Sequence, residues 1–135
     1  MVKSDNSMNG ICMSASHCSE KGGIQDGNCA SGFGVCCMFL VSECGSTVYR
    51  NCTYVTNPGY PSNYGITSQT TCEYEISGDE SICQIRLDFN TLDIADPTTA
   101  GACSTDAFDA VGPSGKNPPR ICGTASGQHS KIHLL

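Results

Sequence analysis

The sequence has 135 residues, a formal net charge of −6 and only seven Lys and Arg residues. This shortage of positive charge disfavours binding to nucleic acid, whose phosphates are held by clustered Lys and Arg side chains. No apolar run approaches the roughly 18 residues that span a bilayer, because the longest, residues 35–41, is too short. Hydrophobic residues make up 39 %, tryptophan is absent, and there are 15 Gly and 6 Pro. This composition is typical of short strands and many turns.

Eleven cysteines divide the chain into two parts. So many thiols in a short chain indicate disulfides formed in an oxidising compartment, and therefore an extracellular, secreted protein. Five cysteines crowd into the beginning of the chain, and six are spread through the remainder. We therefore predict a small Cys-rich module over residues 1–43 and a β domain over residues 44–135. The start of the chain lacks the apolar segment of a secretory signal, so we expect the sequence to be a fragment of a longer protein.

The Cys-rich part ends in an adjacent pair, Cys36 and Cys37. Their side chains project in different directions, so we expect them to bond to different partners. The glycines between the cysteines supply the positive φ angles that tightly cross-linked loops need. A zinc site is disfavoured, since there is no Cys-x2-Cys pair and His17 has no partner pair at finger spacing. The sequence leaves open the disulfide pairing among the five cysteines of this part, Cys12, Cys18, Cys29, Cys36 and Cys37.

The spacing of this first part, with its closing Cys-Cys pair, is similar to the clip-like disulfide knots of arthropod secreted proteins. That resemblance covers about 30 residues and implies a small module held together by bridges instead of a core.

From Cys44 onward the pattern changes to alternating strands. Residues 83–89 place Cys83, Ile85, Leu87 and Phe89 on one face, which predicts a strand with one buried side and the Cys83 thiol directed inward. Shorter alternations occur at residues 72–76, 108–110 and 132–134. Turn-forming Gly, Pro and Asn residues separate them. We therefore predict an all-β fold, an antiparallel β-sandwich.

Several motifs in this second part resemble the CUB domain family. The first is Cys44-Gly45, followed by the Asn-Pro-Gly-Tyr-Pro-Ser-Asn-Tyr stretch at residues 57–64 and by Cys72. The central strands, residues 85–89 and 92–94, and the segments 103–108 and 121–123 follow in the family's order. The resemblance implies a CUB-type jelly-roll β-sandwich without its last strands. It also implies an extracellular binding module with bridges Cys44–Cys72 and Cys103–Cys122.

Two cysteines exceed the family pattern. We predict that Cys52 and Cys83 pair with each other and join the first strand to the central one. Six cysteines then belong to the sandwich and five to the first part. One cysteine of the first part must therefore stay unpaired or bond to a cysteine beyond residue 135.

Many members of the family bind calcium, and the resemblance transfers two of the ligand positions, Tyr64 and Asp106. Ala95 occupies the position of a family Glu, and the last acidic position lies in the segment that this chain lacks. Asp96 is one residue away, but strand alternation directs it elsewhere. We therefore expect no cofactor, with calcium at Tyr64 and Asp106 as the alternative. Without calcium, Asp106 would accept hydrogen bonds from loop N–H groups and Tyr64 would pack against the sheet.

We expect no enzymatic activity. The three histidines, His17, His129 and His133, lie in a disulfide loop and a terminal strand, and no motif of an activated serine or cysteine accompanies them. The sequence Asn51-Cys52-Thr53 fits the acceptor pattern for glycosylation of Asn51.

The function we predict is therefore a non-catalytic module that binds an extracellular protein or glycan. Tyr60, Asn63 and Tyr64, on one turn, are the expected contact residues, although they could also simply pack that turn against the sheet. One alternative is the non-catalytic front part of a secreted clip and CUB serine protease. The other is a structural component of a cuticle or matrix.

Overall fold

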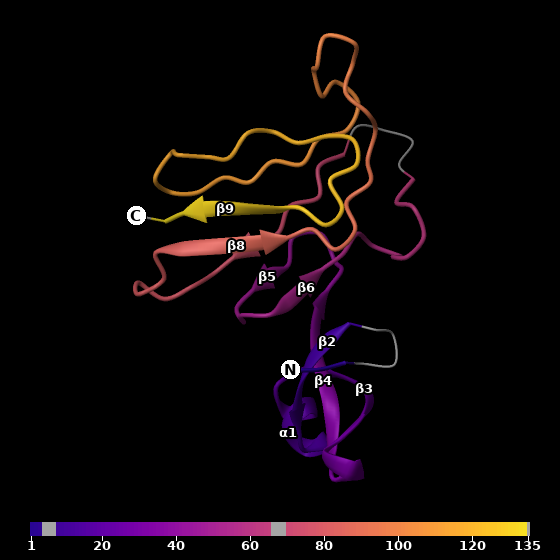
Figure 1. Ribbon diagram of the computed structural model, residues 1–135. Helices are drawn as coiled ribbons and strands as arrows, with labels where there is room; N and C mark the ends of the chain where they lie inside the picture. Colours follow the sequence, from indigo (N-terminus) through magenta and orange to yellow (C-terminus); the bar gives the residue numbers. More distant parts are fainter. Residues whose placement is uncertain (4–7, 66–69, 135) are drawn as a thin grey trace. The chain divides into compact units, whose positions relative to one another are not determined.

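The computed structural model describes residues 1–3, 8–65 and 70–134. Within them the backbone is almost entirely strand, turn and loop (Figure 1). The exceptions are the helix α1 (Ala15–Glu20) and the 3-10 turn η1 (Ala30–Gly32). The chain forms two compact units, Met1–Gly78 and Asp79–Leu135. The predicted all-β class agrees with this structure.

The first unit is built on a sheet in the order β1-β2-β4-β3. Its strands are β1 (Val2–Lys3), β2 (Asn9–Met13), β3 (Ile24–Cys29) and β4 (Gly34–Val41). All of these pairs are antiparallel. A fifth strand, β6 (Thr53–Val55), runs parallel to the end of β4, with Phe39 opposite Thr53. A separate short parallel pair joins β5 (Thr47–Val48) to β7 (Glu75–Ile76).

Two disulfides take the place of a large core in the first part of this unit. Cys12 bonds to Cys29, and Cys18 bonds to Cys37. The Cys18–Cys37 bridge is buried and packs with Phe39 of β4. Cys36, next to Cys37, is also buried, and its Sγ lies 3.6 Å from the backbone oxygen of Val2.

Gly23 shows how closely the chain passes these sulfur atoms. A Cβ atom at this position would come within 2.9 Å of the Cys18 Sγ and closer still to the Cys37 Sγ. Only glycine fits there without displacing the bridge, which explains one of the glycines that the sequence places between the cysteines.

The predicted boundary between residues 43 and 44 falls inside the first unit. The β4–β6 pairing joins residues on both sides of it, because β4 ends at Val41 and β6 begins at Thr53. The Cys-rich part and the first strands of the predicted β domain therefore share a sheet.

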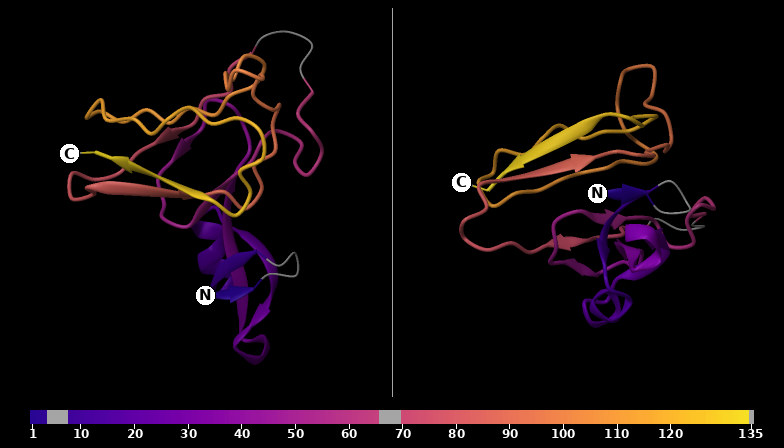
Figure 2. Two further views of the ribbon diagram at one scale, coloured as in Figure 1. Left: turned by 45° about the horizontal axis from the view of Figure 1, so that its top comes forward. Right: turned by 60° about the horizontal axis from the view of Figure 1, so that its bottom comes forward.

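The second unit contains the antiparallel pair β8 (Gln84–Asp88) and β9 (His129–His133), which run side by side in opposite directions in Figures 1 and 2. Ile85 and Leu87 are half-buried and their neighbours are exposed, as alternation predicts. Ile85 lies opposite the buried Ile132. Beyond β8, Phe89 packs edge-to-face on Phe108, with ring centroids 5.2 Å apart.

The structure contains both bridges that the family resemblance implies, Cys44–Cys72 and Cys103–Cys122. Cys52 and Cys83 each carry an exposed, free thiol in the structure. They lie in different units, and the predicted bridge between them stays a prediction. Cys83 directly precedes β8, and its Sγ lies 3.7 Å from the backbone oxygen of Ser81.

Candidate binding surfaces

The turn at residues 57–64 presents two tyrosines to solvent. Tyr60 is 48 % exposed and Tyr64 is 40 % exposed, and Asn63 between them is exposed as well. The Asn57 side chain fixes the turn from within, because its Nδ2 donates hydrogen bonds to the backbone oxygens of Pro58 (3.0 Å) and Ser62 (3.1 Å). The three residues predicted as contacts thus lie together on one exposed, internally hydrogen-bonded turn.

Tyr74 contacts the residue that directly precedes this turn. Its hydroxyl donates a 2.8 Å hydrogen bond to the backbone oxygen of Thr56 and lies 3.2 Å from the Sγ of disulfide-bonded Cys72. Burial raises the pKa of Tyr74 above its ordinary value, and the nearby Tyr64 raises this pKa further through charge repulsion. Tyr74 thus links the turn to the Cys44–Cys72 bridge.

The predicted calcium ligands fall in different units, Tyr64 in the first and Asp106 in the second. Asp106 accepts a 3.2 Å hydrogen bond through Oδ2 from the backbone N–H of Ala95. The family's Glu position and its Asp position are therefore neighbours in space, even though alanine occupies the first. Among the described residues, no three His, Cys, Asp or Glu side chains form a group that could hold a metal. Calcium ligation by Tyr64 and Asp106 stays a prediction.

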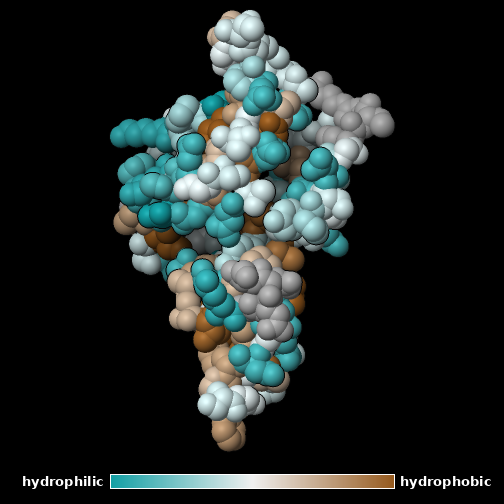
Figure 3. Space-filling view, turned by 45° about the vertical axis from the view of Figure 1, so that its right-hand side comes forward, coloured by the Kyte–Doolittle hydropathy of each residue, from teal (hydrophilic) through white to brown (hydrophobic). Residues whose placement is uncertain are grey.

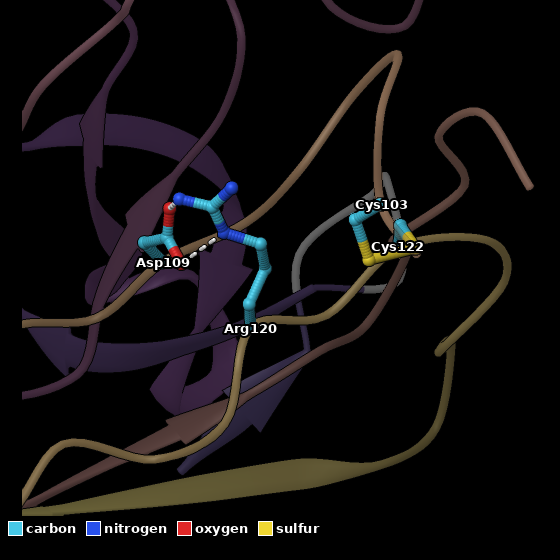
Figure 4. A network of polar contacts seen from close by, with 4 residues as sticks. All are labelled: Cys103, Asp109, Arg120 and Cys122. Carbon is cyan, nitrogen blue, oxygen red and sulfur yellow. Dashed lines mark hydrogen bonds and ion pairs between the residues drawn. A yellow bond between two sulfur atoms is a disulfide. The ribbon is translucent and has the colours of Figure 1, made fainter. Parts of the chain in front are cut away.

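Residues 103–122 form a cross-linked arm in the second unit (Figure 4). The Cys103–Cys122 bridge closes it, and Phe108 and Ile121 pair through two backbone hydrogen bonds of 2.8 and 3.0 Å. Arg120 reaches both carboxylate oxygens of Asp109, at 2.9 Å through Nε and 2.8 Å through its terminal nitrogen. The bidentate contact orients both side chains.

Asn51 lies on an exposed turn before β6. Its Oδ1 accepts a 2.9 Å hydrogen bond from the backbone N–H of Cys52, and the Thr53 hydroxyl donates to the backbone oxygen of Arg50 at 2.8 Å. Cys52 has a positive φ of 59°. The residues of the acceptor pattern are thus exposed or half-buried on a surface turn.

None of the three histidines is buried in the part of the chain that the structure describes. His17, His129 and His133 are all exposed. The Ser114 hydroxyl donates a hydrogen bond to the backbone oxygen of His133 at 2.8 Å. The His133 ring instead lies 3.2 Å from the Gln84 side-chain nitrogen.

Sequence patterns gave no sign of a hollow beside Phe39 in the first unit. A hollow of about 370 Å³ is lined by Ile11, Met13, Lys21, Phe39, Arg50 and Asn51. The guanidinium of Arg50 lies over the Phe39 ring, 5.1 Å from its centroid. The lining residues come from separate parts of the sequence. The only feature that the sequence shows is that two of them, Lys21 and Arg50, are cations in an acidic chain.

Comparison with known families identifies the second part of the chain. The model of the CUB domain matches residues 44–133, which is more than half of the sequence. The chain belongs to the CUB domain family. The predicted family and the CUB-type β fold are therefore confirmed. No curated protein and no solved structure gives a significant match.

CUB domains are generally extracellular, non-catalytic modules that mediate protein interactions. The four disulfides of this CUB-containing chain suit an oxidising extracellular environment. Among the described residues no helix is both long enough and apolar enough to cross a membrane. On the face drawn in Figure 3, hydrophobic residues are interspersed with hydrophilic ones.

Proposed function

We propose that this protein is a secreted, non-catalytic module that binds an extracellular protein or glycan through the turn at residues 57–64. CUB membership over residues 44–133 carries the proposal. The turn supplies what a contact site needs, namely two part-exposed tyrosines on a backbone fixed by the Asn57 side chain. Tyrosine offers a large contact area for little loss of conformational entropy, and for this reason it is common in binding sites.

The proposal includes the division predicted from the sequence, a Cys-rich module over residues 1–43 and a CUB domain over residues 44–135. It also includes a glycan on Asn51. The free thiol of Cys52 supports glycosylation, since a bridge at the middle position of the acceptor pattern would hinder attachment.

The test compares the secreted wild-type protein with the double variant Tyr60→Ala/Tyr64→Ala on arrays of extracellular proteins and of glycans. We expect the double variant to bind any reproducible wild-type partner at least about tenfold more weakly, as for truncation of interface tyrosines. The matched control is Phe33→Ala, which removes an aromatic side chain that is 91 % exposed on another loop of the same unit.

The control should retain wild-type affinity. Equal affinity of the double variant and the wild-type protein would exclude the turn as the contact site. Absence of any reproducible partner on both arrays would contradict the binding function itself. Thermal unfolding of each variant shows whether a loss of binding reflects a loss of fold.

A further inference from the structure

Arg50 takes part in none of the ion pairs observed among the described residues. Among the described residues, the two ion pairs join Arg86 to Asp88 and Arg120 to Asp109. The Arg50 guanidinium instead lies over the ring of Phe39. A guanidinium stacked on an aromatic ring has its flat face occupied, while its N–H groups at the edge remain available as hydrogen-bond donors.

Arg50 shares its hollow with a second cation, Lys21. A smaller hollow of about 130 Å³ is also lined by Lys21, Phe39 and Arg50. Among the described residues that line the two hollows, none is acidic. In a chain with a net charge of −6, this is a local concentration of positive charge.

The backbone at both cations is held by the surrounding fold. Lys21 caps the end of α1, which is anchored by the buried Cys18–Cys37 bridge. The backbone at Arg50 is held by the Thr53 hydroxyl, and Phe39 packs on the same bridge. The Arg50 guanidinium and the Phe39 ring are therefore held against each other before a ligand binds, which reduces the entropy lost on binding.

The remainder of the hollow is mostly apolar. Ile11, Met13 and Phe39 line it together with the two cations and Asn51. A sulfated glycan is hydrophilic and would gain little from the three hydrophobic side chains. A peptide with an acidic residue next to an aliphatic or aromatic residue uses both features, because its carboxylate pairs with the cations and its apolar side chain is buried.

We propose that the Phe39 hollow binds an acidic–hydrophobic peptide segment of a partner protein. The carboxylate of the segment pairs with Arg50 and Lys21, and its neighbouring apolar side chain packs on Ile11, Met13 and Phe39. This inference rests on the proposed binding function and adds a partner chemistry at a second surface, which contains none of the residues of the 57–64 turn.

The test is selection from a randomised heptapeptide library displayed on phage, with the whole secreted protein as bait after glycosidase treatment, because Asn51 lines the hollow. We expect enriched peptides to carry Asp or Glu beside an aliphatic or aromatic residue. The affinity of a synthetic enriched peptide is then measured by fluorescence anisotropy. The double variant Lys21→Gln/Arg50→Gln should bind it at least about tenfold more weakly, because charge-assisted hydrogen bonds are lost.

The matched control is Lys116→Gln/Lys131→Gln, which makes the same change in net charge at exposed positions outside the hollow. It should bind the peptide within about twofold of wild type, and wild-type binding should weaken as salt is raised. Replacing the acidic residue of the peptide by its amide should reproduce the loss seen with the Lys21/Arg50 variant.

Enrichment of basic or uncharged peptides would overturn the inference, and so would equal loss in the two double variants. A heparin oligosaccharide that binds more tightly than the peptide, and does so through Lys21 and Arg50, would overturn it in favour of a glycan. The variant Tyr60→Ala/Tyr64→Ala should retain peptide binding. If no acidic–hydrophobic peptide binds while the partner found on the arrays still does, this inference alone is rejected. If only the binding of the array partner is missing, the function proposed for the turn alone is rejected.

Discussion

Tyr74 connects several features of the first unit through a single side chain. Its hydroxyl binds the backbone oxygen of Thr56 and lies beside the Cys44–Cys72 bridge, and the Tyr64 of the proposed contact turn is near enough to influence its ionisation. Burial disfavours the negatively charged form of Tyr74, so its pKa lies above the ordinary value of 10.0.

This raised pKa predicts how stability depends on pH. The folded protein holds the Tyr74 proton more tightly than the unfolded chain does. The corresponding contribution to stability is complete below pH 10.0 and is lost as pH rises through the raised pKa. In an absorbance titration of tyrosinate, we expect one group to ionise later than the others, and Tyr74→Phe to remove that late phase.

The titration requires alkylated Cys52 and Cys83, because free thiolates exchange with disulfides at high pH. Tyr49→Phe serves as the control, since Tyr49 is 76 % exposed and outside these contacts. A late phase that persists in Tyr74→Phe would show that another tyrosine is responsible.

Among the structural elements, the arm at residues 103–122 is held by two interactions of different kinds. The Cys103–Cys122 bridge is covalent and constrains the unfolded chain. The Arg120–Asp109 pair has good geometry, but both side chains are about half exposed (59 % and 45 %), so water competes with it. The bridge should therefore contribute much more stability than the ion pair.

We predict that Cys103→Ala/Cys122→Ala lowers the free energy of unfolding by about 3 kcal/mol, the value for a loop of this length. Arg120→Gln should lower it by less than about 1 kcal/mol. Guanidinium denaturation monitored by far-ultraviolet circular dichroism measures both. A larger loss in Arg120→Gln than in the cysteine variant would contradict this order.

Across the whole molecule, the cysteines differ in their covalent state. Four bridges occur among the described residues, whereas the thiols of Cys52 and Cys83 are free and exposed. Cys52 also lies in the acceptor pattern of Asn51, so its covalent state and that of the proposed glycan can be measured together.

Intact mass of the secreted protein should show alkylation of Cys52 and Cys83 in the native state. The variant Cys52→Ser/Cys83→Ser, which keeps the acceptor pattern, should carry two fewer labels. Glycosidase treatment should reduce the mass of the wild-type protein and leave Asn51→Gln unchanged. Native protein without labels at either cysteine would show that they are bridged after all, and a wild-type mass that glycosidase does not change would exclude the glycan.

The β class, the CUB family and the strand predicted at residues 83–89, observed at Gln84–Asp88 with Ile85 and Leu87 half-buried, can all be read from the amino-acid sequence. These features depend on short-range alternation and on motifs that can be read along the chain. The same holds for the exposed turn with Tyr60 and Tyr64, because Asn, Pro and Gly fix turns locally.

The parallel β4–β6 pairing, the free thiols of Cys52 and Cys83 and the hollow beside Phe39 become visible only in the folded chain. The pairing joins strands on both sides of the predicted domain boundary, and the hollow collects side chains from β2, from the residue after α1, from β4 and from the turn before β6. Such contacts depend on how distant segments pack, and no local periodicity encodes them.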